Sequence, residues 1–225
     1  MVTFVAGDHT GTGYLALPDQ QSGPGVLVLH AWWGLTPFFH ELCERLASAG
    51  LVAFAPDLYQ GRTATTIDEA ETLLNQRDSE AMQAIADGAL TYFRAHPAVR
   101  GDGIAALGFS LGAAYATDLA SAAPADIKAV VIFYGTASAD FTQARAAYLA
   151  HFGADDEMEP LDGVREFEAD LRAAGRDVTF HVYPGVQHWF FETNRPEYNA
   201  QAAELAWQRT IEFLRPYRSE AEATE

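Results

Sequence analysis

The sequence predicts an α/β fold, in which helices flank both faces of a mostly parallel sheet. Short apolar runs, typical of strands buried on both faces, alternate along the chain with segments of helical periodicity. The 225 residues suit one domain, and 49% apolar with 20% charged residues allow a sizeable core. Because there is no internal repeat or long linker, we expect one domain over residues 1–218 and a frayed acidic tail at 219–225.

The expected strands are apolar or β-branched runs bounded by turn residues. VTFV at 2–5 and GYLAL at 13–17 come first, followed by the continuous apolar run VLVLH at 26–30. Such an unbroken run is typical of a parallel strand covered on both faces. The remaining expected strands cover residues 51–56, 104–109, 128–135, 147–153 and 178–185.

The expected helices are marked by caps or by apolar residues three and four positions apart. Thr36 can cap a helix with Pro37 at its first position, and Gly50 ends that helix. Thr66 and Glu69 form a possible capping box before a second helix. The other expected helices begin at Asp78 or Ser79, cover 111–123 and 161–175, and close the chain from about 196 to 215.

Composition narrows the class of protein. A net charge of −17, with one lysine among 14 basic residues, argues against nucleic acid or an anionic membrane as partner. The single cysteine, Cys43, cannot form an internal disulfide, and its helical apolar surroundings predict a small core residue. We find neither a secretory signal nor an apolar run long enough to cross a membrane. We therefore expect a cytoplasmic protein that is a monomer or small homo-oligomer.

The motif GFSLG, residues 108–112, lies where a predicted strand turns into a predicted helix. Gly-x-Ser-x-Gly in that context is a nucleophile elbow, a sharp turn that projects the serine hydroxyl from the sheet edge. A β-carbon at Gly108 or Gly112 would crowd the turn, and the N-terminus of the following helix offers free N–H groups to a developing negative charge. A tight glycine turn with an incidental serine is the alternative, and the flanking elements make it the weaker interpretation.

A serine nucleophile needs a base and an acid that orients it, in the chain order Ser, Asp or Glu, His. Asp155 or Asp156 follows the strand at 147–153, and His188 follows the strand at 178–185. His30, at the end of an early strand, is the one serious rival base, but it precedes the serine and is better explained as ordering its own loop. No spacing resembles a zinc site, so we expect no metal and no cofactor.

These segments together resemble the dienelactone hydrolase family of α/β-hydrolases. The resemblance rests on VLVLHAWWGL, GLVAFAPDLYQGR, IAALGFSLGAA, LAHFGADDEMEP and VYPGVQHWF and extends over nearly the whole chain. It implies a single-domain α/β-hydrolase fold without a large lid domain. It also implies a triad of Ser110, Asp156 (in G-x-x-D) and His188 (in YPG-x-x-H), and so favours Asp156 over Asp155.

The resemblance further implies an oxyanion hole from the backbone N–H groups of Leu111 and Trp32. Three positions depart from the family's name-giving enzymes. Ser110 replaces a cysteine, and Ala31 replaces a glutamate that controls the thiol, so these two changes agree with each other. Glu192 stands where those enzymes have an arginine for the substrate carboxylate; Arg62 and Arg195 could replace it, although each is more simply a solvated loop residue.

We therefore expect a serine hydrolase that cleaves a small ester or lactone through an acyl-enzyme. A thioesterase, an acyltransferase and a true dienelactone hydrolase use the same machinery and stay open, as does a non-catalytic binding protein of the same fold. Aromatic residues in the expected loops could line an apolar substrate pocket, although each could equally be core. The candidates are Trp33, Phe38, Tyr59, Tyr134 and Trp189.

Overall fold

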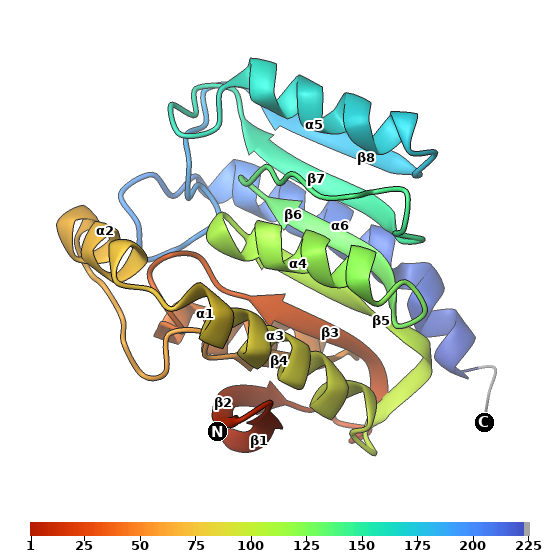
Figure 1. Cartoon of the computed structure of the whole chain (residues 1–225). Coiled ribbons are helices and arrows are strands. Elements are labelled where there is room, and N and C mark those ends of the chain that lie inside the picture. Colours follow the sequence, from red (N-terminus) through yellow and green to blue (C-terminus); the bar gives the residue numbers. More distant parts are fainter. Residues whose placement is uncertain (223–225) are drawn as a thin grey trace. The chain divides into compact units, whose positions relative to one another are not determined.

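The computed structural model describes the backbone of residues 1–222 and the side chains of residues 1–217. It divides into two compact units: Met1–Ile104 with the residues after Pro216, and Ala105–Pro216. Residues 223–225, the end of the predicted acidic tail, lie outside the described residues. Each unit is a layer of strands covered by helices (Figure 1).

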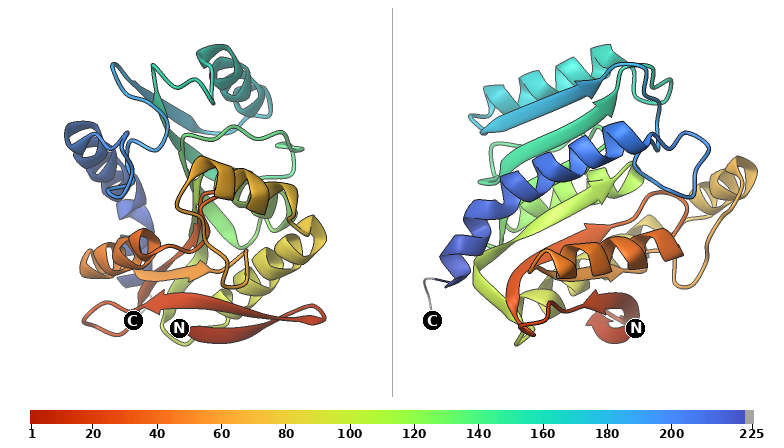
Figure 2. Two further views of the ribbon diagram at one scale, coloured as in Figure 1. Left: turned by 90° about the vertical axis from the view of Figure 1, so that its left-hand side faces the viewer. Right: turned by 180° about the vertical axis from the view of Figure 1, so that it is seen from behind.

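The first unit carries the N-terminal strands in the order β1-β2-β4-β3-β5. The pairs β1–β2 and β2–β4 are antiparallel, whereas β3 and β4 run parallel with Val26 opposite Ala53. Helices α1 and α3 cover opposite faces of these strands (Figure 2). The elements are β1 (Val2–Ala6), β2 (His9–Ala16), β3 (Gly23–Leu29), α1 (Pro37–Ser48), β4 (Val52–Pro56), α2 (Ile67–Asn75), α3 (Ser79–Arg94) and the first part of β5 (Val99–Phe109).

The second unit continues the same pattern in the strand order β5-β6-β7-β8. The pairs β6–β7 and β7–β8 are parallel, and Ala150 lies opposite Ile132 on one side and Phe180 on the other. Helices α4 and α5 cover one face and α6 the other (Figures 1 and 2). The elements are α4 (Leu111–Ala122), β6 (Ile127–Phe133), β7 (Ala147–Gly153), α5 (Leu161–Ala173), β8 (Val178–Tyr183) and α6 (Ala200–Glu222).

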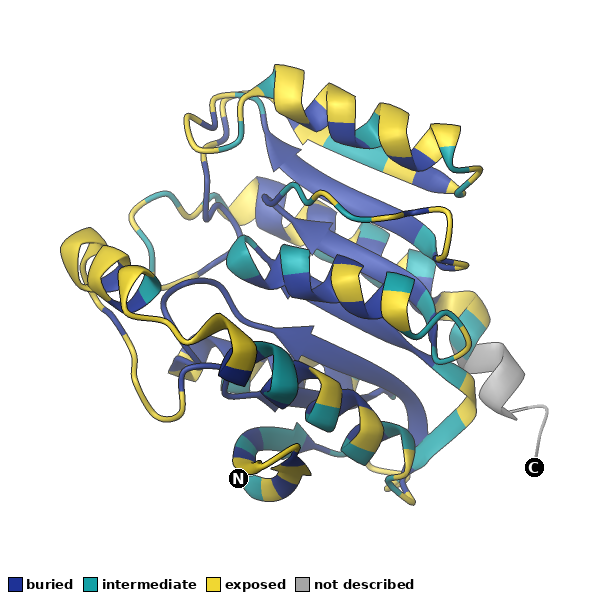
Figure 3. Ribbon diagram, in the orientation of Figure 1, coloured by how far each residue is buried: buried dark blue, intermediate teal, exposed yellow. Residues whose placement is uncertain are grey.

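Local signals in the sequence explain most of these elements. The buried strands are the continuous apolar runs, and the exposed residues gather on the outer faces of the helices (Figure 3). The predicted capping box is present: Thr66 accepts from the backbone of Glu69, whose side chain accepts in return from the backbone of Thr66. Asp78 caps α3 through its carboxylate. Cys43 is fully buried in α1, and burial raises the pKa of its thiol, as expected of a core residue.

The closing helix is the largest error in the predicted boundaries, because we expected residues 196–215 and α6 spans Ala200–Glu222. It begins later because Asn199 caps it, with its side-chain oxygen accepting from the N–H of Ala202 at 3.0 Å. It continues past Pro216, which removes one helical hydrogen bond without ending the helix. The helix therefore includes residues 219–222, which we had assigned to the frayed tail.

Candidate active site

Ser110 occupies the turn between β5 and α4 with a backbone that few residues adopt. Its φ of 48° and ψ of −114° put a non-glycine residue in the left-handed half of conformational space. Such strain costs about 1–3 kcal/mol and persists where the surroundings hold it in place. Here the Ser110 N–H donates to the Phe133 carbonyl oxygen at 2.9 Å, and the Ser110 carbonyl accepts from Ala113 at 2.9 Å. The turn is therefore fixed on both sides of the serine.

Two glycines leave the room that this turn needs. A β-carbon at Gly108 would collide with the Gly112 carbonyl oxygen and lie 2.7 Å from the Ala113 Cα. A β-carbon at Gly135, just after β6, would lie 2.6 Å from the Ser110 carbonyl oxygen. Because real β-carbons do not approach other atoms so closely, the strand, the serine and the helix can meet only with glycine at these positions.

His188 lies in the segment after β8 and contacts both of its predicted partners. Its Nε2 is 3.0 Å from the Ser110 Oγ, and its Nδ1 is 2.7 Å from the Asp156 Oδ2. Because an ionised carboxylate can only accept, Nδ1 carries the proton and Nε2 is left to accept from the serine hydroxyl. The imidazole is buried, with 4% of His188 exposed. The structure thus brings together three side chains that are far apart in sequence.

The carboxylate of Asp156 is held in place by the chain that follows it. Its Oδ1 accepts from the backbone N–H groups of Met158 at 2.9 Å and Glu159 at 3.0 Å, which leaves Oδ2 for the imidazole. Asp156 is buried whereas Asp155 is exposed, so the contacts with His188 distinguish two residues that the sequence pattern alone left open. At Gly153 a β-carbon would collide with the Val186 carbonyl oxygen, so this glycine lets the loops after β7 and β8 approach each other.

Leu111 is the first residue of α4, whose initial backbone N–H groups have no intrahelical partner. Trp32, the other residue predicted to donate to an oxyanion, belongs to the first unit, and its role stays a prediction. Three of the predicted pocket residues are buried in the first unit among aromatic neighbours. These ring contacts are Trp33 with Trp32 at 5.4 Å, Phe38 with Phe39 at 5.0 Å and Tyr59 with His30 at 5.5 Å.

The other two predicted pocket residues, Tyr134 and Trp189, lie against the imidazole of His188. Both ring centroids are 4.9 Å from the imidazole centroid. Both residues have positive φ, 40° at Tyr134 and 57° at Trp189, so each is held in a strained turn. Both are also buried, and contact with substrate stays a prediction for each.

A further carboxyl group, which the sequence motifs did not point to, lies near the triad. Glu159 accepts hydrogen bonds from the Thr136 N–H at 3.2 Å and the Thr136 Oγ1 at 2.8 Å. Burial is the main cause of the raised pKa of its carboxyl group, and the nearby Asp156 charge adds to it. The residue ties the loop after β7 to the loop after β6. Its position three residues after Asp156 was the available signal.

Glu192 does not behave as a surface carboxylate. It is fully buried, and the Tyr134 hydroxyl donates to its Oε1 at 3.0 Å. Burial raises the pKa of Glu192 to about 8. Of the two arginines considered as replacements, Arg62 is exposed as expected, whereas Arg195 is half-buried. Burial lowers the pKa of the Arg195 guanidinium, and the Glu192 and Glu197 carboxyls offset part of that lowering. The expectation of a solvated Arg195 was therefore wrong.

His30 serves its own loop in the first unit. Its Nδ1 is 2.7 Å from the Ala31 carbonyl oxygen, and its Nε2 accepts from the Leu58 N–H at 3.1 Å. Burial lowers the pKa of His30, so the ring is neutral and both nitrogens bind backbone. The imidazole thus joins the loop after β3 to the loop after β4.

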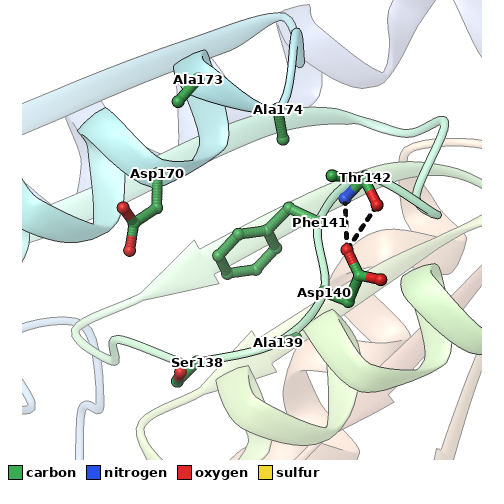
Figure 4. Close-up of a pocket in the computed structure, with 8 residues that line it drawn as sticks. All are labelled: Ser138, Ala139, Asp140, Phe141, Thr142, Asp170, Ala173 and Ala174. Carbon is green, nitrogen blue, oxygen red and sulfur yellow. Dashed lines mark hydrogen bonds between the residues drawn. The ribbon is translucent and has the colours of Figure 1, made fainter.

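A hollow of about 310 Å³ opens elsewhere in the second unit, between the loop at 138–142 and the C-terminal end of α5 (Figure 4). Neither the serine, the aspartate nor the histidine lines it, so we do not assign it to the active site. Among the residues that the structure describes, no His, Cys, Asp and Glu side chains form a group able to hold a metal ion. Within the same residues, no helix is both long enough and apolar enough to cross a bilayer.

Comparison with known proteins decides the family, because the model of the dienelactone hydrolase family matches residues 12–218. The chain belongs to the dienelactone hydrolase family. It is 30% identical to a protein of Aquifex aeolicus described as "Putative carboxymethylenebutenolidase", over 96% of this chain and 98% of the relative. It is 31% identical to "Protein usf" of Aquifex pyrophilus over the same shares.

Solved structures agree with the family. A solved structure described as "Putative Dienelactone Hydrolase" from Klebsiella pneumoniae superposes with a TM-score of 0.83 at 26% identity. The match covers 94% of this chain and 95% of that one. The predicted α/β-hydrolase fold is thereby confirmed, and no lid domain is evident among the described residues. Membership of this family indicates that the chain is a hydrolase acting on ester or lactone bonds.

Proposed function

We propose that the chain hydrolyses small esters or lactones through an acyl-enzyme on Ser110. The observation that supports this most strongly is the geometry at His188, with Nε2 3.0 Å from the serine oxygen and Nδ1 2.7 Å from the Asp156 carboxylate. Both distances are within hydrogen-bond reach, as a nucleophile, its base and an orienting acid require.

In the proposed reaction the Ser110 oxygen attacks the carbonyl carbon while its proton passes to the His188 Nε2. Asp156 stabilises the imidazolium, and the N–H groups of Leu111 and Trp32 bind the oxyanion, where loss of one donor typically lowers turnover about 10²–10³-fold. The tetrahedral intermediate collapses, and the leaving alkoxide takes the proton from Nε2. Water then attacks the acyl-enzyme by the same proton transfers in the opposite order, which releases the acid and restores the serine.

Labelling by a fluorophosphonate probe tests the proposal. We expect covalent labelling of the native chain and none in Ser110→Ala, with kcat on p-nitrophenyl acetate falling about 10⁶-fold. The matched control is Ser121→Ala, which removes a hydroxyl from the opposite end of α4 and should leave labelling unchanged. Labelling that persists in Ser110→Ala would remove this serine from the mechanism. A folded native chain that is never labelled would favour the alternative, a non-catalytic binding protein of the same fold.

For substrate class, we propose neutral esters or lactones with a small apolar or aromatic group. Tyr134 and Trp189 both pack on the imidazole, which favours apolar groups near the reacting carbonyl. The net charge of −17 disfavours a substrate with carboxylates. A comparison of kcat/KM for aryl acetates and for carboxylate-bearing lactones tests this, and a clear preference for the anionic lactone would refute it.

We further propose that the enzyme acts in the cytoplasm on small molecules. The supporting observations are its single buried cysteine and its acidic surface, which suits neither nucleic acid nor anionic lipid. Fractionation of cells that produce the tagged chain tests the location. Recovery in the membrane or secreted fraction would contradict it.

A further inference from the structure

Tyr134 occupies a strained position directly after β6. Its φ is 40°, and its N–H donates to the His151 carbonyl oxygen at 2.8 Å, which fixes its backbone to the neighbouring strand β7. An aromatic residue rarely adopts this conformation, so the surroundings must hold it there. Its side chain is fully buried. Strained residues of this kind are common at functional sites, where they aim a side chain.

The ring of Tyr134 faces the imidazole of His188. The two centroids are 4.9 Å apart with the planes inclined at 56°. On other sides the ring contacts Phe190 at 5.5 Å and Phe109 at 5.9 Å, both edge to face. These separations lie in the range of favourable aromatic contacts, so the phenol ring is held in place and in turn restrains the imidazole.

The hydroxyl of Tyr134 is tied to the segment that carries the histidine. It donates to the Glu192 Oε1 at 3.0 Å, and Glu192 lies four residues after His188. The Glu192 N–H donates to the Trp189 carbonyl oxygen at 2.9 Å, which closes a turn from 189 to 192. One hydrogen bond therefore joins the end of β6 to this turn.

Both members of this pair are uncharged near neutral pH. Burial raises the pKa of Glu192 to about 8, while the hydrogen bond from Tyr134 and the Arg195 charge lower it and the Glu197 charge raises it. Burial, followed by Glu192 and more weakly Asp156, raises the pKa of Tyr134 well above its usual range. The second Glu192 oxygen has no hydrogen bond among the described residues. A buried oxygen without a partner costs less free energy in a neutral carboxyl group than in a carboxylate, which agrees with a protonated Glu192.

We propose that Tyr134 is a positioning residue for His188 and that Glu192 holds it in place through the phenol hydroxyl. The inference rests on the proposed function, in which His188 is the base. The hydrogen bond that the His188 Nδ1–H donates to Asp156 fixes the tautomer but still allows the imidazole to tilt. The face of Tyr134 limits that tilt and keeps Nε2 directed at the Ser110 Oγ. Small misplacements of reacting groups can lower turnover about 10²-fold.

Two substitutions at Tyr134 separate the ring from the hydroxyl. Tyr134→Leu removes both, and we expect kcat to fall about 10²-fold with KM within about twofold. Tyr134→Phe keeps the ring and loses its tether, and the expected fall is roughly three- to tenfold. The matched control is Tyr148→Phe, because Tyr148 is also buried in the second unit and its hydroxyl has no hydrogen bond among the described residues. The control should keep the native kcat.

Glu192→Gln tests the tether itself, because glutamine still accepts from Tyr134 but cannot ionise. The variant should therefore keep the native kcat within about twofold. Glu192→Leu removes the acceptor of the Tyr134 hydroxyl, and we expect kcat to fall about as far as in Tyr134→Phe, roughly three- to tenfold. A folded Glu192→Leu with the native kcat would overturn the role of Glu192.

The positioning role is overturned if folded Tyr134→Leu, measured by thermal unfolding, keeps the native kcat. The rate of fluorophosphonate labelling separates this failure from failure of the proposed function. If Ser110 is labelled rapidly, and at the same rate in the native chain and in Tyr134→Leu, the positioning role of Tyr134 is rejected while the proposed function stands. Slower labelling in the variant supports it, and no labelling of the native chain would reject the proposed function together with the inference that rests on it.

Discussion

Two of the buried histidines, His30 and His188, occupy comparable positions beyond the carboxyl end of a parallel strand, and their hydrogen-bond partners differ. His30, after β3, places one ring nitrogen against the Ala31 carbonyl and the other against the Leu58 N–H. His188, after β8, places its nitrogens against the Asp156 carboxylate and the Ser110 hydroxyl. The first histidine binds only backbone at these two contacts, whereas the second lies between two side chains.

This difference shows that the partners of the two ring nitrogens decide whether a buried histidine has a structural or a catalytic role. Backbone partners cannot change protonation at neutral pH, so His30 can serve as a fixed bridge between two loops. A hydroxyl partner can give up its proton to the Nε2 of His188, and a carboxylate partner stabilises the positive charge that results. The account therefore predicts that changes near His188 affect turnover, whereas changes at His30 affect stability.

The largest expected effect is on His188 itself. His188→Ala should lower kcat on p-nitrophenyl acetate about 10⁶-fold, because both the base and the later acid are lost. Thermal unfolding should change little in comparison, and exogenous imidazole is expected to restore part of the activity. A variant that keeps more than a tenth of the native kcat would contradict the role of His188 as the base and therefore its contrast with His30.

Asp156→Asn should follow, with kcat reduced about 10⁴-fold. The amide can donate to Nδ1, which favours the tautomer with its proton on Nε2 and so prevents that nitrogen from accepting from the serine. Asp155→Asn is the matched control, because the neighbouring carboxylate is exposed and should be replaceable without loss. Equal losses in the two variants would contradict the assignment of Asp156.

Glu192→Gln should change the pH dependence of stability. Glu192 keeps its proton up to about pH 8 in the folded chain, whereas an unfolded glutamate loses it near pH 4.5. Between these values the unfolded state binds fewer protons, so native stability falls with rising pH by about 1.4 kcal/mol per unit. The variant lacks this loss. Its thermal midpoint should therefore exceed the native one by an amount that grows from pH 5 to pH 8, and parallel curves would show that Glu192 does not titrate as described.

The smallest expected effect is at His30. His30→Leu leaves the Leu58 N–H without its side-chain acceptor, and an unpaired buried donor costs about 1–3 kcal/mol. The Ala31 carbonyl still accepts from the Gly34 N–H, so it adds little. Urea unfolding measures the loss, with the exposed His9→Leu as a control that should stay within about 0.5 kcal/mol of native. If His30→Leu lowered kcat as much as His188→Ala does, the distinction between a structural His30 and a catalytic His188 would be contradicted.

The parts of the site that the sequence could predict are those with strong local constraints. The turn at Ser110 needs glycine at position 108, and the motif of five consecutive letters that contains it is visible in the sequence. The second glycine that the turn needs, Gly135, lies after another strand and is not part of that motif. The strand ends preceding Asp156 and His188 are visible as apolar runs, so the loops could be located. Chain order alone could not distinguish Asp155 from Asp156, and the choice of Asp156 rested on the family resemblance. Burial of Asp156 and its contact with His188 make that distinction in the structure, and the contact joins residues 32 positions apart.

The parts that could not be predicted depend on contacts between distant residues. Tyr134 and Glu192 are 58 positions apart, and their hydrogen bond follows from the strained φ of Tyr134, which the sequence YG does not reveal. Glu192 was interpreted through the family pattern as a group facing substrate, whereas it is buried and accepts a hydrogen bond from Tyr134. Its place directly after the apolar run WFF was the signal that this carboxyl is not at the surface.

The most direct test of the central claim is to trap the acyl-enzyme. Rapid acid quenching during turnover of p-nitrophenyl acetate, followed by peptide mass mapping, locates the acetyl group. We predict one acetyl group on the peptide that contains Ser110, formed as fast as the initial burst of p-nitrophenol. Full turnover with the acetyl group on a different residue would contradict the account.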